Sequence, residues 1–375
     1  MVSNLDPART DAQLGSRPRR VAMLVLRNDA MDGRLLRQSS ALRRAGYAVE
    51  IFPILTHNNP ISTGQVTRRV LQPIAYRLRK RLLFKMLNDF APDLILAHEP
   101  EALDVAAAYL DGIDLPLIYD AHEFYEEQVL ATQDRIAWLR KTYARASDKM
   151  NALITVSPGL KRLYADHYPC FPSATLIYNA PEAKSLGPYD GRLHNALSLS
   201  RDTKILLYQG RVSVGRGLLD VALASKYLPE NWVTVFMGYG QLHSAIPDMK
   251  RLYTMDAVPN DELHNWTRGA NLGLIPYPAS TANHIYCLPN KLWEYPLAGV
   301  PVLSNNLVDI STVLEKWEIG VTYRRDGQGV ALAKAVTDIR DEDLLAMQSN
   351  CTTFAATENW GEYQKEFLNI VALLL

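Results

Sequence analysis

Short apolar runs alternate with amphipathic segments along the first half of the chain. The runs lie at residues 20–27, 47–54, 92–99, 116–123 and 152–157. Such runs are typical of parallel strands, which are buried on both faces. Residues 32–46 instead carry apolar side chains at helical spacing and end at Gly46, which predicts a helix. The pattern therefore predicts a doubly wound α/β domain over residues 20–185.

The same rhythm restarts after residues 186–203, a turn-rich stretch that is expected to link two domains. Four more apolar runs follow, at residues 204–210, 232–238, 271–277 and 300–305. They predict a second Rossmann-like domain over residues 204–355, with residues 356–375 forming a helix that crosses back to the first domain. Two such domains that face each other leave a deep cleft at the carboxyl ends of their strands.

Composition narrows the class of protein. A length of 375 residues suits two domains, and the formal net charge of zero gives no field that would favour nucleic acid. The three cysteines are far apart and have no metal-site spacing, which fits reduced thiols in the cytoplasm. Residues 1–19 are polar and lack the apolar core of a signal peptide, so we expect a flexible tail.

Two strands of the first domain are expected to end in the same pair of residues. His98 and Glu99 follow one apolar run, and His122 and Glu123 follow another. A histidine at a strand end can donate to a sugar hydroxyl or a phosphate, or act as a base, although it can equally cap a helix. No third ligand lies at a suitable spacing for zinc, so we predict no metal site.

A glycine- and arginine-rich loop opens the second domain. An apolar strand runs into Gly210 and Arg211, and Gly215, Arg216 and Gly217 precede a helix. Glycines allow close approach of the backbone to a ligand, and arginines suit a diphosphate. The spacing matches neither the P-loop nor the dinucleotide fingerprint. A solvated turn with two surface arginines is the alternative.

Residues 286–306 predict a short helix followed by a strand. Pro289 suits the first helical position, and Gly299 suits the end of the helix. Lys291 adds charge for phosphates, and Glu294 offers a carboxylate that matches the vicinal diol of a ribose. The alternative is an amphipathic helix whose Glu294 faces solvent.

Together these segments resemble glycosyltransferases of the GT-B fold and, among them, the retaining family 4. The resemblance covers nearly the whole chain from residue 20, and residues 288–306 match the donor-site helix of that family most specifically. It implies two facing Rossmann-like domains and transfer of a sugar, of the hexosyltransferase type, from a nucleotide-sugar donor to a glycan or lipid-linked acceptor. It also implies that no metal or other cofactor is needed.

The resemblance implies roles for single residues. His122 would act beside the donor sugar, Arg211 and Arg216 would bind the diphosphate, and Glu294 would bind the ribose. The other donor-site positions that it implies are Gly210, Gly217, Val258, Tyr286, Leu288, Asn290 and Lys291. The positions expected near the donor phosphates or the acceptor are Gly33, Arg34, His98, Glu99 and Glu123.

One position departs from the family pattern. Many members carry an acid eight residues before the ribose-binding one, and Tyr286 stands there in this chain. Two alternatives therefore stay open: a partner protein that binds sugar nucleotides without transfer, and a sugar-nucleotide epimerase. A Rossmann oxidoreductase is disfavoured, because neither half contains GxGxxG.

A basic segment at residues 67–85 suggests where the acceptor is met. It contains no acid and interleaves leucines with Arg68, Arg69, Arg77, Arg79, Lys80, Arg81 and Lys85. Such a segment can lie on an anionic membrane surface, or it can be a solvated helix that packs its leucines on the domain. We expect a cytoplasmic enzyme of cell-surface polysaccharide or glycolipid synthesis, peripheral to the inner face of the membrane.

Overall fold

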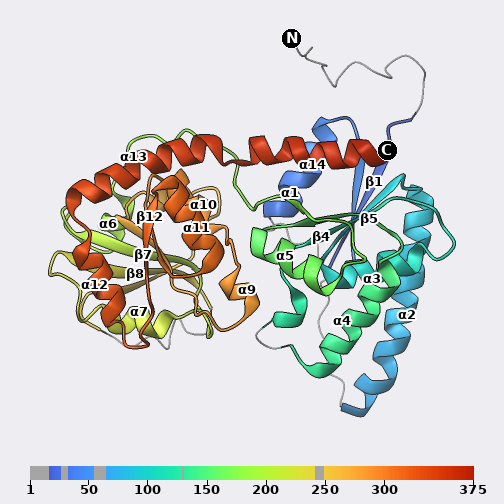
Figure 1. Cartoon of the computed structure of the whole chain (residues 1–375), viewed down its shortest axis with the longest axis horizontal. Coiled ribbons are helices and arrows are strands. Elements are labelled where there is room, and N and C mark those ends of the chain that lie inside the picture. Colours follow the sequence, from blue (N-terminus) through green and yellow to red (C-terminus); the bar gives the residue numbers. More distant parts are fainter. Residues whose placement is uncertain (1–16, 27–32, 55–64, 129–130, 241–248) are drawn as a thin grey trace, which may run out of the picture.

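Two parallel β-sheets form the centres of two domains that lie side by side (Figure 1). The computed structural model describes residues 17–26, 33–54, 65–128, 131–240 and 249–375, and only the backbone of residues 65–77. The first sheet has the order β2-β1-β3-β4-β5-β6 and the second the order β12-β11-β10-β7-β8-β9. Helices cover both faces of each sheet, so the predicted doubly wound architecture is confirmed.

The strands of the first sheet are β1 (Arg20–Val25), β2 (Ala48–Pro53), β3 (Leu94–His98), β4 (Leu117–Ala121), β5 (Met150–Thr155) and β6 (Thr175–Leu176). Its helices are α1 (Gly33–Arg44), α2 (Gln65–Phe90), α3 (Glu99–Tyr109), α4 (Gln133–Ala146) and α5 (Pro158–His167), with a 3-10 turn, η1, at Tyr125–Glu127. All five apolar runs of the first half became strands of this sheet.

The strands of the second sheet are β7 (Lys204–Arg211), β8 (Trp232–Tyr239), β9 (Leu252–Asp256), β10 (Leu272–Ile275), β11 (Val302–Asn305) and β12 (Gly320–Tyr323). The helices that follow the first domain are α6 (Arg192–Ala196), α7 (Leu218–Ala224), α8 (Leu263–Thr267), α9 (Ala282–Ile285), α10 (Lys291–Leu297), α11 (Val308–Trp317), α12 (Val330–Asp338), α13 (Asp341–Thr357) and α14 (Trp360–Leu374). The helix expected from Pro289 begins at Lys291, two residues later, and contains Pro296.

Alternate residues of the central strands enter different hydrophobic cores. In β1, Ala22 and Leu24 pack on one face of the sheet, whereas Val21 and Met23 pack on the other. The same alternation separates Leu207 from its neighbours in β7. Because successive side chains of a strand point to opposite faces, a strand covered on both sides must be apolar throughout.

The last helix, α14, lies on the first domain. It runs across the top of the molecule in Figure 1 and packs near α1. Its Trp360, Phe367 and Val371 side chains share a core with Met23 of β1. The stretch expected as a linker includes α6, whose Leu193 packs in the core of the second domain. Residues 1–16 of the predicted tail lie outside the described residues.

Candidate functional site

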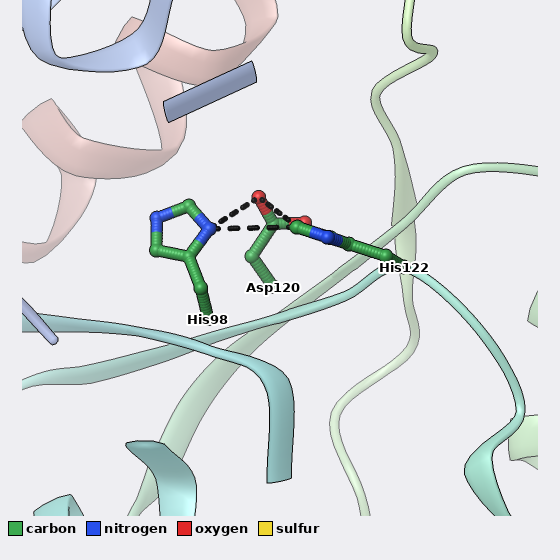
Figure 2. A group of neighbouring side chains, drawn as sticks. All are labelled: His98, Asp120 and His122. Atoms are coloured by element: carbon green, nitrogen blue, oxygen red, sulfur yellow. Dashed lines mark hydrogen bonds and ion pairs between the residues drawn. The ribbon is translucent and has the colours of Figure 1, made fainter. Parts of the chain in front are cut away.

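Three polar side chains meet where β3 and β4 end (Figure 2). The Asp120 Oδ2 atom lies 3.5 Å from His98 Nδ1 and 3.6 Å from His122 Nε2, and the two histidine nitrogens are 3.4 Å apart. Asp120 is opposite His98 in the register of the two strands, which explains the proximity. Asp120 and His98 are buried, whereas the side chain of His122 is 20% exposed.

Helix α1 holds the Asp120 carboxylate from the other side. Arg34 donates from Nε and Nη2 to the two carboxylate oxygens, at 2.8 and 2.7 Å, and Gln38 Nε2 donates to Oδ2 at 2.7 Å. Burial alone would raise the pKa of the Asp120 carboxyl, but the Arg34 guanidinium and then His122 hold that pKa well below its usual range. Asp120 is therefore an anion at neutral pH, and it fixes the end of β4 beside His122.

Arg34, expected near the donor phosphates or the acceptor, is held inside the first domain. Its side chain is 5% exposed and also donates to the Ile177 carbonyl oxygen and to Asn179 Oδ1, at 2.8 and 2.9 Å. The guanidinium therefore points into the first domain, and Arg34 is not among the residues that line the cleft. Its charge neutralises Asp120, and a role beside the donor phosphates stays a prediction.

The three side chains are also near enough to one another to hold a metal ion. The oxygen that faces both histidines, however, already accepts hydrogen bonds from Arg34 and Gln38. The Arg34 guanidinium also supplies the positive charge that a metal would bring to this carboxylate. The geometry favours a hydrogen-bonded network over a metal centre; that the reaction needs no metal stays a prediction.

A cavity of about 820 Å³ lies between the two domains. Its volume is in the range of small-molecule sites. The first domain contributes His122, Glu123, Gln128 and Asn179, and the second contributes Gly215, Arg216, Tyr277, Asn283, His284, Leu288, Asn290 and Lys291, among others. The site is thus built from strand ends and loops of both sheets, at the place where open α/β sheets bind ligands.

Two cations converge on one phenol in this cavity. The Tyr277 hydroxyl accepts hydrogen bonds from Arg216 Nη1 at 2.8 Å and from Lys291 Nζ at 3.1 Å. Lys291 is only 9% exposed. Among the described residues, no carboxylate forms an ion pair with either cation. Two such charges beside a cavity favour an anion with more than one negative charge, such as a diphosphate.

Two glycines allow close packing beside these cations, one against Lys291 and one against Pro276. Gly210 has a φ of +110°, and a Cβ atom there would lie 3.2 Å from Lys291 Nζ. Gly217, with a φ of +75°, lies so close to the Pro276 carbonyl oxygen that a Cβ atom would overlap it. Both predicted glycines therefore support the site without lining the cavity.

Glu294 lies one turn beyond Lys291 and is partly buried. Its Oε2 atom accepts a hydrogen bond from Gln209 Nε2 at 2.8 Å, and Gln209 Oε1 accepts one from the Thr267 hydroxyl at 2.7 Å. Burial raises the pKa of the Glu294 carboxyl, whereas Lys291 and Gln209 oppose that shift. Glu294 is thus oriented by a neighbour that the sequence did not indicate.

The predicted site residues divide into two groups. The cleft cavity is lined by His122, Glu123, Arg216, Leu288, Asn290 and Lys291. The other predicted residues do not line it: Gly33, Arg34, His98, Glu99, Gly210, Arg211, Gly217, Val258, Tyr286 and Glu294. Glu99 begins α3 with a φ of +67°, and Gly33 begins α1.

The structure shows the surroundings of three of the latter residues, and their expected roles in donor binding stay predictions. Arg211 is exposed at the end of β7, so of the two arginines only Arg216 reaches the cavity. Val258 packs against the core of the second domain. Tyr286 packs against the core of the first domain, with its ring beside Gly159. The position of the missing acid is thus occupied by a side chain that contacts the other domain.

Sequence comparison relates the chain to known glycosyltransferases. Residues 34–181 match the family model of Glycosyltransferase Family 4. A Bacillus subtilis (strain 168) protein named as a teichuronic acid biosynthesis glycosyltransferase, TuaC, is 23% identical over 284 residues, which are 75% of this chain and 68% of that protein.

Solved structures share the fold over nearly the full length. Sucrose-phosphate synthase from Thermosynechococcus elongatus has a TM-score of 0.75 at 16% identity, covering 95% of this chain and 99% of that chain. The Anabaena protein Alr3699/HepE, solved with UDP and glucose, has a TM-score of 0.72 at 16% identity and covers 95% of this chain and 100% of that chain. The predicted GT-B fold and the resemblance to family 4 glycosyltransferases are confirmed.

Proposed function

We propose that the chain transfers a sugar from a nucleotide-diphosphate donor to a glycan or lipid-linked acceptor, with retention at the anomeric carbon. The observation that supports this most is the convergence of Arg216 and Lys291 on the Tyr277 hydroxyl beside the interdomain cavity. These cations would stabilise the charge that develops on the departing diphosphate, a task that a metal ion performs in other enzymes. The complex of the Anabaena protein with UDP and glucose makes UDP the first nucleotide to test.

The proposed roles of the remaining residues follow from their positions. His122 lines the cavity from the first domain, opposite the cations, and would contact the sugar that is transferred. Its Nε2 atom faces Asp120, which would orient the imidazole ring. Glu294, held by Gln209, would accept hydrogen bonds from the ribose hydroxyls. Specificity for the sugar would then rest on cavity residues such as His284, in place of the acid that Tyr286 replaces.

A transfer assay tests the proposal. Radiolabelled nucleotide sugars are incubated with the purified protein, with and without an extract of membrane lipids and glycans. The proposal expects label to enter the extract, with nucleotide released only when the extract is present. Release of nucleotide or an isomerised sugar without acceptor would favour an epimerase. Binding without turnover would favour a partner protein. In either case transfer would be refuted.

We further propose that α2 brings the enzyme to the anionic inner face of the membrane, where a cell-surface polysaccharide or glycolipid would be built. Leu78, Leu82 and Met86 form a stripe at four-residue spacing and are 59, 59 and 42% exposed. Leu83 and Leu87 point instead into the core of the first domain. The solvated-helix alternative requires the leucines to pack on the domain, and two of these leucines do not.

Exposed basic residues flank this stripe: Arg79, Arg81 and Lys85. The side chains of Arg68, Arg69 and Arg77 lie outside the described residues. Cations beside exposed leucines favour a surface of anionic lipid, since the leucines enter the boundary of the acyl chains while the cations stay with the headgroups. Among the described helices, none has the length and apolar character of a membrane span.

Replacing both Leu78 and Leu82 by serine is expected to weaken binding to anionic liposomes by about tenfold or more, because the two side chains lose their apolar burial in the lipid. Cosedimentation with vesicles at low salt measures this. Leu345→Ser is the matched control, because Leu345 is 67% exposed on α13 of the other domain. Equal loss in the control, or no binding by the wild type, would remove the membrane from the proposal.

A further inference from the structure

One side chain of the second domain binds both backbone groups of a residue in the first domain. Asn283 of α9 accepts a hydrogen bond from the Phe124 N–H at 2.7 Å and donates from Nδ2 to the Phe124 carbonyl oxygen at 2.9 Å. The side-chain amide of Asn283 thus pairs with the N–H and the carbonyl of Phe124, as the backbone of a neighbouring strand would. Figure 1 shows α9 at the boundary of its domain, facing the first domain.

A second contact lies three residues further along the same segment. The Tyr286 carbonyl oxygen accepts a hydrogen bond from the Ser157 hydroxyl at 2.6 Å. The Tyr286 ring lies so close to Gly159 that a Cβ atom there would overlap it, and the Arg162 guanidinium lies 5.6 Å from the ring centre. This close approach requires glycine at position 159.

A third contact between the two domains comes from α11. The Asp309 Oδ2 atom accepts a hydrogen bond from the Gly159 N–H at 2.7 Å. Asp309 is only 5% exposed, and Gly159 lies in the first turn of α5. The carboxylate of one domain therefore satisfies a free N–H group at the start of a helix in the other.

We propose that Asn283, supported by Tyr286 and Asp309, is a positioning residue. It holds His122 across the cavity from Arg216 and Lys291, the cations that would bind the donor diphosphate. Phe124 is two residues from His122, so a fixed Phe124 backbone restricts where His122 can lie. Residues 281–291 carry both Asn283 and Lys291, and the two border the same cavity. One segment thereby sets the distance between the sugar side of the cleft and its diphosphate side.

This inference rests on the proposed function for its effect on transfer, but the contact itself is measurable without substrate. Hydrogen exchange of the Phe124 amide reports the bond to Asn283 directly. In Asn283→Ala this amide is expected to exchange at least about tenfold faster, because its acceptor is lost. Tyr286→Ala removes the ring contact with Gly159 but keeps the backbone carbonyl that Ser157 binds, and it is expected to have a smaller effect of the same sign. Asn195→Ala is the control, since Asn195 is exposed on α6.

Kinetics separate positioning from donor binding. Asn283→Ala is expected to lower kcat by about 10- to 100-fold while the Kd for the nucleotide changes less than about twofold, because a displaced reacting group costs rate and not nucleotide contacts. An unchanged Phe124 exchange rate or an unchanged kcat would overturn the inference. So would an equal loss in nucleotide affinity, which would make Asn283 a donor ligand. If the wild type transfers no sugar, the proposed function fails, while the exchange rates still decide the contact.

Discussion

Replacing Lys291 by alanine is expected to lower kcat/KM for sugar transfer by about 100- to 1,000-fold, the usual cost of removing one charged stabiliser of a leaving group. Lys291 is 9% exposed, and its ammonium lies 3.1 Å from the Tyr277 hydroxyl and shares that hydroxyl with Arg216. In a site that excludes water, its charge acts on the diphosphate with little screening. Steady-state kinetics with the identified donor measure the loss.

Lys226→Ala is the matched control for this prediction. Lys226 is exposed and follows α7 in the same domain, so its removal should leave kcat/KM unchanged. A loss of less than about threefold in Lys291→Ala would mean that the ammonium does not meet the departing charge. The diphosphate would then have to be bound elsewhere, and the donor site would need a different location.

Replacing Asp120 by asparagine is expected to lower the free energy of unfolding by about 3–5 kcal/mol at neutral pH, the cost of breaking a buried ion pair by removing one partner. The substitution keeps the shape of the side chain but removes the negative charge that pairs with the Arg34 cation, which is 5% exposed. Asp111→Asn is the control, because Asp111 pairs with Arg145 and Lys149 at the surface, where little change is expected. Urea unfolding measures both.

The effect of Asp120 must also depend on pH. The pKa of its carboxyl is lower in the folded chain than in the unfolded one, so the folded state binds fewer protons. The stability that it contributes is therefore complete above the unfolded pKa of about 4 and declines as the pH falls toward the folded pKa. The gap between wild type and Asp120→Asn should shrink in acid. A gap that stays constant, or one below about 1 kcal/mol at neutral pH, would contradict the ion-pair interpretation.

Glu294 should make nucleotide binding depend on pH, and here the pKa of the carboxyl is raised, whereas that of Asp120 is lowered. Burial raises the pKa of its carboxyl, so ionising it costs stability as the pH rises through that pKa. Two ribose hydroxyls that donate to the carboxylate would offset this cost. Nucleotide affinity is therefore expected to fall on acidification toward that pKa in the wild type and to vary less in Glu294→Gln. Titration calorimetry across pH measures it, and parallel profiles would exclude Glu294 as a ribose ligand.

The central strands could be predicted because they are covered on both faces. Every residue of β3 and β4 is buried, so each strand is a run of apolar residues except near its end, where His98 and Asp120 lie. The edge strands gave no such signal. Strand β9 is half exposed along its length, and β6 has only two residues. Pairing with a neighbouring strand, which the local sequence does not encode, makes these segments strands.

Site residues could be predicted only where their type and their local sequence were enough to suggest a chemical role. His122, Arg216 and Lys291, which line the cavity, were suggested by a strand end, a glycine-rich loop and the start of a helix. Gln38 and Asn283 were missed because their partners are 82 and 159 positions away. Asp120 could have been found, since an acid inside a strand that is buried on both faces must have a buried partner.

The measurement that tests the donor site most directly is equilibrium binding of UDP, GDP, ADP and CMP to the wild type, Lys291→Ala and Glu294→Ala, followed by thermal unfolding. One nucleotide at a hundred times its Kd is expected to stabilise the wild type by about 2.7 kcal/mol, and both variants should lose most of that gain. If no nucleotide stabilises the wild type, or if both variants bind it as tightly, the cavity beside Arg216 and Lys291 is not the donor site.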